Sequence, residues 1–390
     1  MRKRSLVLLV ALAVICMVAG SAFAADSKAK AQWTFMVFLN GDNNLDPYGD
    51  KDMVEMKKIG STADVNIVVL QDHRTKPAQK LLVTKGGVEV LETIGKIDTG
   101  DYKEMVKFVK WASEKYPAEH YLLDIWNHGA GWKKSKKQSI LKGISYDDGS
   151  GNHITTPQLG ESMKQIKVIL GQNLDVLGMD ACLMQMMEVG YEVKDTVNFI
   201  AASEETEPGD GWPYDAILEP LVKNPKMSAE ELANVTVQAY QKCYSKVPDT
   251  TQSSVECAKF DAVCVKLDKF ATAMLAKLSD QTIAAGIKKA GAAVQVYAYD
   301  DNCDLVHFCQ LVNANVKDDA INKAADELIA VVASAPSKIV KLSFNSGNNV
   351  KNSNGLAIYL PKRSVAGNYK DIALGKTAWA NFIAEYVKIK

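Results

Sequence analysis

A histidine and a cysteine each follow an apolar run that ends in a short polar loop. His128 follows the run YLLDIW, and Cys182 follows the run LDVLGM. In a parallel sheet the loops at the carboxyl ends of the strands hold ligands and catalytic groups, so both side chains are expected at one edge. Gly129 and Gly131, beside the histidine, would let a substrate backbone approach closely. The arrangement therefore allows a cysteine–histidine pair.

The chemistry of such a pair is acyl transfer through a thiolate. A helix is predicted over residues 183–194, directly after Cys182, and a helix amino terminus lowers the pKa of a nearby thiol. A histidine within reach would protonate the leaving amine and activate water for deacylation. Taken singly, a loop histidine or a buried thiol is more often structural than catalytic. Their combination at two strand ends favours catalysis.

Alternating patterns around these residues predict the elements that position them. Short runs rich in Val, Ile and Leu alternate with helical patterns, which is typical of βα units around a largely parallel sheet. Strands are predicted at residues 33–39, 65–70, 121–126, 174–179 and 199–202, with a hairpin formed by 81–84 and 88–91 around Gly86-Gly87. Helices are predicted at residues 52–58, 102–115, 156–169 and 183–194, with a short one opening at Trp212-Pro213.

The pattern changes after Asn224-Pro225. Ser228-Ala229-Glu230-Glu231 is a capping box for a long helix, and helical segments continue to about residue 333. Residues 339–344 and 356–360 are predicted strands that either pair with each other or extend the main sheet. A soft domain boundary is therefore placed near residue 225.

The first 24 residues have the pattern of an export signal. Basic residues at positions 2–4 precede an apolar run over 6–18, and an A-x-A cleavage signal ends at Ala24. The run is too short to favour a retained transmembrane helix. A lipoprotein interpretation through Cys16 is disfavoured by the bulky residue before it. The mature protein is expected to be secreted, periplasmic or at the cell surface.

The overall composition narrows the class of protein. The chain of 390 residues carries 46 basic and 46 acidic residues, and this balance argues against the clustered basic face of a nucleic-acid-binding protein. Its length suits one large domain with an elaboration, or two domains. The cysteines beyond the signal either form disulfides or stay buried as free thiols, and no CxxC pair supports a zinc site; they are Cys182, Cys243, Cys257, Cys264, Cys303 and Cys309.

Longer motifs resemble those of the clostripain family of cysteine peptidases, in the broad group of caspases, legumains and gingipains. The match is carried by WTFMVFLNGDNNLD, YLLDIWNHGAGW, GISYDDGSGNHIT, LDVLGMDACLMQMMEVGYEV and ASEETEPGDGWPY, with a weaker GLAIYLP. The resemblance implies an α/β fold, a caspase-like α/β/α sandwich with a largely parallel central sheet. The expected organisation is a signal peptide (1–24), a catalytic domain (25–225) and a mostly helical C-terminal region (226–390).

The resemblance also implies roles for individual residues. Cys182 would be the nucleophile and His128 the general acid/base, and the backbone N–H groups of Gly129 and Cys182 would form the oxyanion hole. Asp180 matches the acidic residue in the family's pocket for a basic side chain, which implies cleavage after Arg or Lys. Alternatively, Asp180 caps the helix predicted after Cys182.

Other acids near the predicted site have less specific roles. Glu207 and Asp210 would supplement the pocket for a basic side chain, together with Glu204 and Glu205 of the same acidic segment, although such segments are often merely solvated. Asp124 lies on the strand that leads to His128, where a structural role and an orienting role both remain open.

The resemblance further implies self-processing between the histidine and the cysteine, after basic residues. The segment holds Lys133, Lys134, Lys136 and Lys137 in a polar stretch suited to nicking. These lysines are therefore predicted to form a self-cleavage loop, the alternative being a solvated charged loop.

Calcium is expected as a cofactor on the resemblance alone. Loop carboxylates that could supply oxygen ligands are Asp42, Asp46, Asp50, Asp147 and Asp148. None of these runs has the spacing of an EF-hand, and Asp147-Asp148-Gly149 equally fits a turn. No metal ligand is assigned, and no organic cofactor is expected.

Together these observations predict an exported cysteine endopeptidase that acts on peptides or proteins with Arg or Lys at the cleaved position. The main alternative is a noncatalytic exported binding or scaffold protein that retains the fold. Another acyl transfer by the same pair, such as transpeptidation, would share the acyl-enzyme and differ only in the acceptor.

Overall fold

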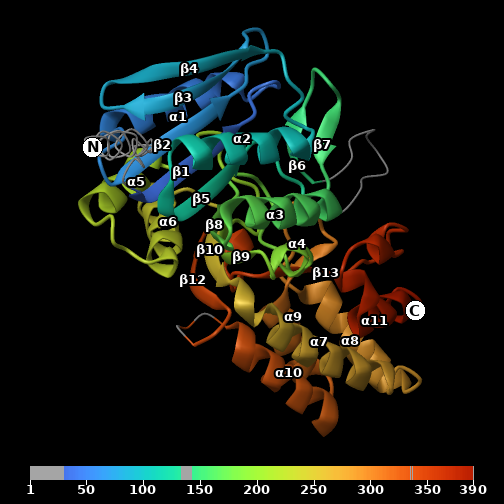
Figure 1. Cartoon of the computed structure of the whole chain (residues 1–390). Helices are drawn as coiled ribbons and strands as arrows, with labels where there is room; N and C mark the ends of the chain where they lie inside the picture. Colours follow the sequence, from blue (N-terminus) through green and yellow to red (C-terminus); the bar gives the residue numbers. More distant parts are fainter. Residues whose placement is uncertain (1–29, 133–142, 334, 336, 390) are drawn as a thin grey trace, which may run out of the picture.

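The structure is a computed structural model that describes residues 30–132, 143–333, 335 and 337–389. Within these ranges a nine-stranded sheet runs in the order β12-β10-β9-β8-β5-β1-β2-β3-β4 (Figure 1). Its central strands are parallel, namely β1 (Ala31–Leu39), β2 (Val65–Gln71), β5 (Ala118–Trp126), β8 (Leu174–Gly178) and β9 (Val197–Ala202). The predicted strands of the first half are thus confirmed.

Antiparallel strands complete both edges of the sheet. At one edge lies the predicted hairpin of β3 (Ala78–Thr84) and β4 (Gly87–Gly95). At the other edge β10 (Thr250–Glu256) pairs with β9, and β12 (Val340–Ser346) pairs with β10. Of the two predicted C-terminal strands, the first therefore extends the main sheet. The helical pattern predicted around β10 is wrong, because this strand has a polar sequence, TTQSSVE, whose side chains are almost all buried.

Helices cover both faces of the sheet, as an α/β/α sandwich requires. On one face lie α1 (Asp46–Ile59), α5 (Tyr214–Lys223) and α6 (Ala229–Tyr244), and on the other α2 (Tyr102–Lys115), α3 (Thr156–Leu170) and α4 (Met187–Val193). Side chains alternate between the two faces of the sheet along β1, which explains the two layers. Phe35 and Val37 pack into one hydrophobic core, and Met36 and Phe38 pack into the other.

The C-terminal region adds a helical layer beside the sandwich (Figure 1). It contains α7 (Phe260–Leu275), α8 (Gln281–Ala293), α9 (Leu305–Asn315), α10 (Asp319–Val332) and α11 (Ala378–Tyr386). Short 3-10 helices are η1 (Cys257–Lys259), η2 (Asn348–Val350), η3 (Tyr369–Asp371) and η4 (Leu374–Lys376). The second predicted C-terminal strand, β13 (Ala357–Tyr359), pairs with β11 (Asn302–Asp304) instead of with β12.

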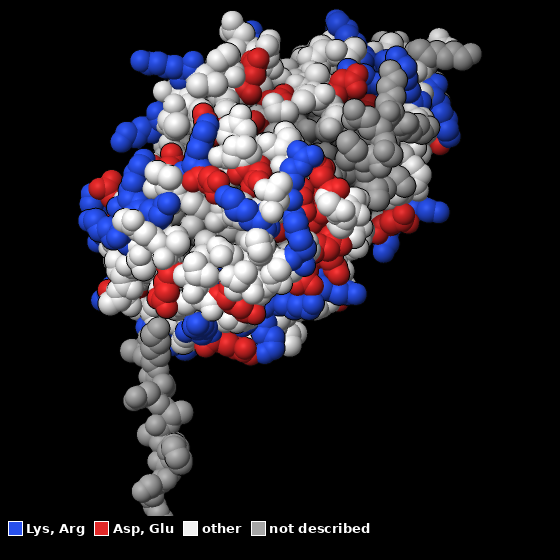
Figure 2. Space-filling view, turned by 90° about the horizontal axis from the view of Figure 1, so that it is seen from above, with Lys and Arg blue, Asp and Glu red and all other residues white. Residues whose placement is uncertain are grey.

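A small hairpin follows the gap in the described chain. It consists of β6 (Ile144–Asp147) and β7 (Asn152–Ile154). Seen from above, basic and acidic side chains are interspersed over the surface, in keeping with the balanced charge (Figure 2). In the described part of the chain, every helix is too short or too polar to span a bilayer.

Candidate active site

The loops after β5 and β8 meet at one edge of the sheet. The two strands are parallel neighbours, with Leu122 opposite Val176, so their carboxyl ends point the same way. His128 follows β5 and Cys182 follows β8, and both line one cavity of about 200 Å³. The same cavity is lined by Asp180 and Glu207. The structure therefore brings together the histidine, the cysteine and two of the acids singled out from the sequence.

Gly129 is a point at which the loop after β5 packs against the loop after β8. A Cβ atom on this residue would lie 2.3 Å from the backbone oxygen of Cys182 and 3.0 Å from the Cβ of Ala181. Only glycine permits so close an approach. The backbones of Gly129 and Cys182, the two predicted oxyanion-hole donors, are consequently in direct contact.

The thiol of Cys182 is half-buried and unpaired with any other cysteine. Burial raises its pKa, and the Asp180 carboxylate acts in the same direction. The backbone N–H of Glu207 donates to Sγ at 3.2 Å and opposes this shift. A backbone donor of this kind stabilises a thiolate.

The helix predicted directly after Cys182 is absent at that position. α4 begins only at Met187, because Leu183 adopts a left-handed conformation with φ of 65° and donates its N–H to the carbonyl of Glu205. The predicted lowering of the thiol pKa by a helix amino terminus is therefore wrong. The same finding excludes Asp180 as the cap of that helix.

His128 is oriented by a residue that the sequence did not reveal. Its Nε2 lies 2.8 Å from the Oδ1 atom of Asn44, near the end of the loop that joins β1 to α1. Because an amide oxygen only accepts, this contact assigns the hydrogen to Nε2 and leaves Nδ1 free to accept a proton. Burial lowers the pKa of His128, and the Asp148 carboxylate opposes that shift. A neutral imidazole of this kind is suited to act as a base.

Asp180 is buried and held by donors from the far side of the cavity. Its Oδ2 accepts the backbone N–H of Trp212 at 3.0 Å and the hydroxyl of Tyr214 at 3.1 Å. Asp124 in turn accepts the N–H of Asp180 at 3.1 Å and contacts the same hydroxyl at 2.6 Å. Asp124 therefore positions Asp180 rather than His128.

Four carboxyl groups gather beneath the cavity. They are Asp52, Asp124, Asp180 and Glu207, and the hydrogen bonds that they accept come from neutral groups. The exposed Lys51 ammonium acts electrostatically on Asp52. Burial raises the pKa of Asp52 to about 9 and that of Asp124 to about 8, and the Asp180 carboxylate adds to both shifts. At neutral pH these two acids are thus held in their neutral form, and a cation that entered the site would favour their ionised form.

The remaining acids of the segment after β9 point elsewhere. Glu204 accepts from the hydroxyl of Tyr297 and the N–H of Gly355, whereas Glu205 accepts from the backbone of Thr206 and Ala298. Asp210 is exposed and lies 2.9 Å from Lys51. Among the described acids of this segment, Glu207 is the one that lines the cavity. The lysines of the predicted self-cleavage loop, 133, 134, 136 and 137, lie outside the described residues.

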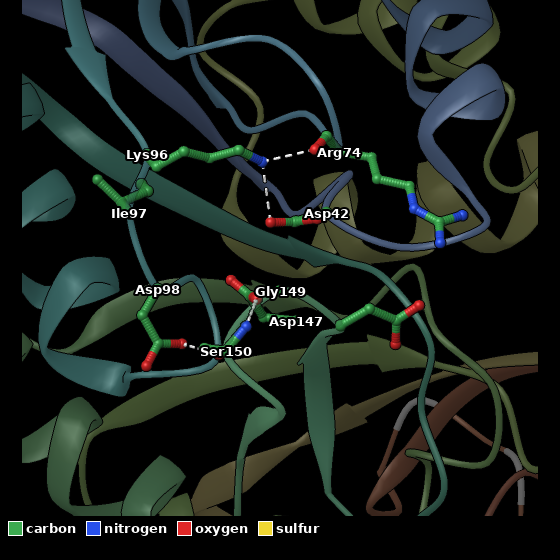
Figure 3. A pocket seen from close by; sticks show the side chains of 9 residues that line it. Asp42, Arg74, Lys96, Ile97, Asp98, Asp147, Gly149 and Ser150 are labelled. Atoms are coloured by element: carbon green, nitrogen blue, oxygen red, sulfur yellow. Dashed lines mark hydrogen bonds and ion pairs between the residues drawn. The ribbon is translucent and has the colours of Figure 1, made fainter.

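A second cavity, of about 590 Å³, is lined by Asp42, Lys96, Asp98 and Asp147 among others (Figure 3). Near it, carboxylate oxygens of Asp42, Asp72 and Asp147 lie within 4.8 Å of one another. Three such oxygens suit a hard cation such as calcium. However, the ammonium of Lys96 already lies 3.0 Å from Asp42 and donates to the carbonyls of His73 and Arg74. A calcium ion would have to displace it.

The other acids considered as calcium ligands have different partners. Asp46 lies 2.7 Å from Nδ1 of His73, and Asp50 accepts from Gln71 and faces Lys76. The Asp147 side chain also accepts the N–H of Ser150 at 2.7 Å, which is the turn expected for Asp147-Asp148-Gly149. Of the five acids, Asp42 and Asp147 belong to the three-carboxylate cluster, and Asp72 completes it.

Comparison with known proteins identifies the family. Residues 37–386 match the clostripain family, peptidase C11. Clostripain of Hathewaya histolytica is 24% identical over 222 residues, a segment that covers 48% of this chain and 41% of clostripain. The match therefore spans less than half of that relative.

Two solved structures have the same fold over nearly the whole chain. A secreted C11 cysteine protease from Bacteroides thetaiotaomicron, bound to an irreversible peptide inhibitor, has a TM-score of 0.68 at 18% identity, covering 90% of this chain and 99% of its own. An inactive zymogen C11 protease from Parabacteroides distasonis has a TM-score of 0.67 at 18% identity, covering 89% and 98%. The caspase-like fold is thereby confirmed.

The chain belongs to the clostripain family. Its fold and its family are those of a cysteine-type endopeptidase, in agreement with the resemblance of its motifs.

Proposed function

We propose that this protein is an exported cysteine endopeptidase that hydrolyses peptide bonds after Arg or Lys. One observation carries the proposal: a single cavity is lined by Cys182, His128 and the acids Asp180 and Glu207. A nucleophile, a base and a pocket of negative character thus lie within reach of one bound peptide.

The reaction starts with transfer of the Cys182 proton to Nδ1 of His128. The thiolate attacks the scissile carbonyl carbon, and the oxygen takes up negative charge close to the N–H groups of Gly129 and Cys182. The C–N bond then breaks, and His128 gives its proton to the leaving amine. Water, deprotonated by His128, attacks the thioester and releases the carboxylic acid and the free thiol. Asn44 keeps the imidazole in the required tautomer.

The specificity for a basic side chain follows from the charges beneath the cavity. A lysine or arginine that enters would find the carboxylate of Asp180, which is already fixed by Trp212 and Tyr214. Charge-assisted hydrogen bonds in such a buried site are strong, and a guanidinium can form two in parallel. A neutral side chain would offer the Asp180 carboxylate no such bond.

Export and self-processing complete the proposal. Residues 1–24 would be removed as a signal peptide, and a cut after Lys133, Lys134, Lys136 or Lys137 would place His128 and Cys182 on separate chains. The hydrogen bonds between β5 and β8 would still join those chains. The descriptions of two relatives as secreted and as a zymogen support this course.

Calcium would be held by Asp42, Asp72 and Asp147. It would add positive charge close to the loop that carries Asn44, and so stabilise the support of His128. Lys96 would have to leave Asp42 for the ion to bind.

The test is hydrolysis of matched fluorogenic peptides that end in Arg, Lys, Gln or Asp. The wild-type protein and Cys182→Ala are compared with and without calcium, and a gel follows cleavage of the chain itself. Turnover of Arg or Lys peptides that depends on Cys182 is expected. The raised pKa of the Cys182 thiol favours one alternative, a noncatalytic exported binding protein. The absence of turnover of all four peptides would support that alternative.

A further inference from the structure

One polar atom at the cavity lacks an ordinary hydrogen-bond partner. Glu207 as a residue is half-buried, but its Oε2 atom is fully buried, and no N–H or O–H group of the described residues donates to it. Its other oxygen has only a long contact of 3.4 Å with Nε2 of Gln252. An ionised carboxylate left this way in a buried site would be costly.

One neighbour of Glu207 is another acid. The carboxyl group of Glu207 lines the same cavity as that of Asp180, and burial together with the Asp180 carboxylate raises its pKa. Two carboxylates only accept, so a hydrogen bond between them requires one proton. With Glu207 Oε2 buried and without a donor, the two neighbouring groups at this cavity are more stable as one carboxylic acid and one carboxylate than as two carboxylates.

The surroundings assign the proton to Glu207. Burial raises the pKa of Asp180 as well, but Asp180 receives an N–H from Trp212 and the hydroxyl of Tyr214, and these donors oppose that shift and favour its ionised form. Glu207 lacks comparable donors. Burial raises its pKa, and the neighbouring Asp180 carboxylate raises it further.

None of the groups around this pair supplies a positive charge at neutral pH. The groups that act on Glu207 are Asp180, Cys182, Asp124 of β5, and Tyr240 and Tyr244 of α6. His128 lines the same cavity, and burial lowers its pKa. Within the described chain, the proton on Glu207 is thus what lets the two acids share this cavity.

We propose, on the basis of the proposed function, that Glu207 holds a proton in the empty pocket and releases it when a basic side chain enters. The O–H bond of Glu207 breaks, the proton passes to the solvent buffer, and the cation of the substrate takes its place between the two carboxylates. Glu207 is then a second specificity-determining residue, because a neutral side chain cannot drive the release. Affinity for a basic side chain should rise with pH, by at most about tenfold per pH unit for one proton, and affinity for a neutral one should not.

The test is calorimetry on the full chain carrying Cys182→Ala, which cannot turn over. Two peptides that differ only in a final Arg or norleucine are titrated at one pH in two buffers with different enthalpies of ionisation. The Arg peptide should show a buffer-dependent heat equivalent to release of up to about one proton, and the norleucine peptide none.

Two further variants assign the proton. In Glu207→Gln the side-chain amide can donate to Asp180 but cannot ionise, so proton release should vanish and Arg affinity should fall roughly tenfold. Glu205→Gln is the matched control, because it lies on the same loop and its carboxylate bonds to Thr206 and Ala298 instead. It should release the proton as before. Thermal melts establish that both variants are folded.

The outcomes separate this inference from the proposed function. Tighter binding of Arg than of norleucine without a buffer-dependent heat would overturn the role of Glu207 and leave the basic specificity intact. Proton release that persists in Glu207→Gln would also overturn it, since the proton would then come from another acid. Equal binding of both peptides would remove the basic specificity itself, and this inference with it.

Discussion

Gly129 packs directly on the backbone of Cys182, with space for a hydrogen and none for a methyl group. The contact sets the distance between the histidine loop and the cysteine loop, which are also joined by the sheet and by a hydrogen bond from the N–H of Asn127 to the carbonyl of Asp180. It makes Gly129 a point at which a minimal change should affect catalysis more than folding.

Gly129→Ala should lower kcat/KM by roughly a hundredfold or more, the usual cost of displacing an oxyanion-hole donor. The added Cβ must push the Cys182 carbonyl away and separate the two loops. Gly151→Ala is a useful control for backbone strain alone, because Gly151 has a positive φ of 75° but open space around its Cβ position. Equal losses in both variants would contradict a special role for the Gly129 contact.

Asp180→Asn should lower kcat/KM for Arg and Lys substrates by roughly 10- to 100-fold, the value of a charge-assisted hydrogen bond. The loss for a norleucine substrate should be much smaller. Asp210→Asn provides the comparison, because this exposed acid pairs with Lys51 outside the cavity. This variant should leave kcat/KM unchanged for both the basic and the norleucine substrates. A uniform loss across all substrates in Asp180→Asn would remove the residue from the specificity pocket.

The rate at which iodoacetamide labels Cys182 should rise with pH, and later than for a free thiol, because burial raises the pKa of this cysteine. Since the Asp180 carboxylate also raises that pKa, Asp180→Asn should shift the labelling profile toward lower pH. Labelling must be quantified on the Cys182 peptide by mass spectrometry, as Cys243 is exposed. A profile that is unchanged or moves upward would contradict the electrostatic assignment.

Asp52→Asn should stabilise the protein at alkaline pH. Burial and the Asp180 carboxylate raise the pKa of Asp52 from 3.8 to about 9. The native state thus binds more protons than the unfolded state within this window, and its stability must fall as pH rises through it, by at most about 1.4 kcal/mol per pH unit for one group. The variant loses this dependence, so its advantage in free energy of unfolding should grow from pH 5 to pH 8.

The matched control for Asp52→Asn is Asp64→Asn, at an exposed position. Urea unfolding of both variants across the pH range provides the comparison. A variant at Asp52 that is equally or less stable than wild type at pH 8 would argue that the buried acid is ionised and paired.

Calcium should raise the melting temperature of Lys96→Met more than that of the wild-type protein. Removing the ammonium frees Asp42 and leaves the oxygens of Asp42, Asp72 and Asp147 for the ion. Lys76→Met is a suitable control, since Lys76 faces Asp50 outside this cluster. An identical effect of calcium on all three proteins would exclude the cluster as the binding site, and magnesium in place of calcium would test selectivity.

Much of this arrangement was predictable because apolar periodicity reports burial. The runs before His128 and Cys182 are nearly continuous in Val, Ile, Leu and aromatic residues, and these runs form β5 and β8 as expected. Their position in adjacent parallel strands then brings the two loops together without further information.

Other features depend on contacts that no local pattern reveals. Asn44 lies in a polar run, GDNNLD, and only the fold brings it to His128. The strand β10 is buried because Thr251 and Ser253 find hydrogen-bond partners in Ser203 and Gly355, so it lacks an apolar signature. α4 begins later than predicted because the N–H of Leu183 donates to the carbonyl of Glu205. Helix propensities do not include a contact between residues so far apart in the sequence.

The hydrogen bonds that hold Glu204 in the segment after β9 affect when, during its synthesis, the protein can become active. Glu204 depends on Tyr297 and Gly355, which follow it by 93 and 151 residues. A ribosome-bound or partly exported chain that ends before residue 355 lacks the partners that shape the segment bearing Glu207. The cavity cannot reach its final form until residue 355 has been synthesised. Latency during biosynthesis would thus be built into the order of the sequence, before any removal of a leader or cut in a loop.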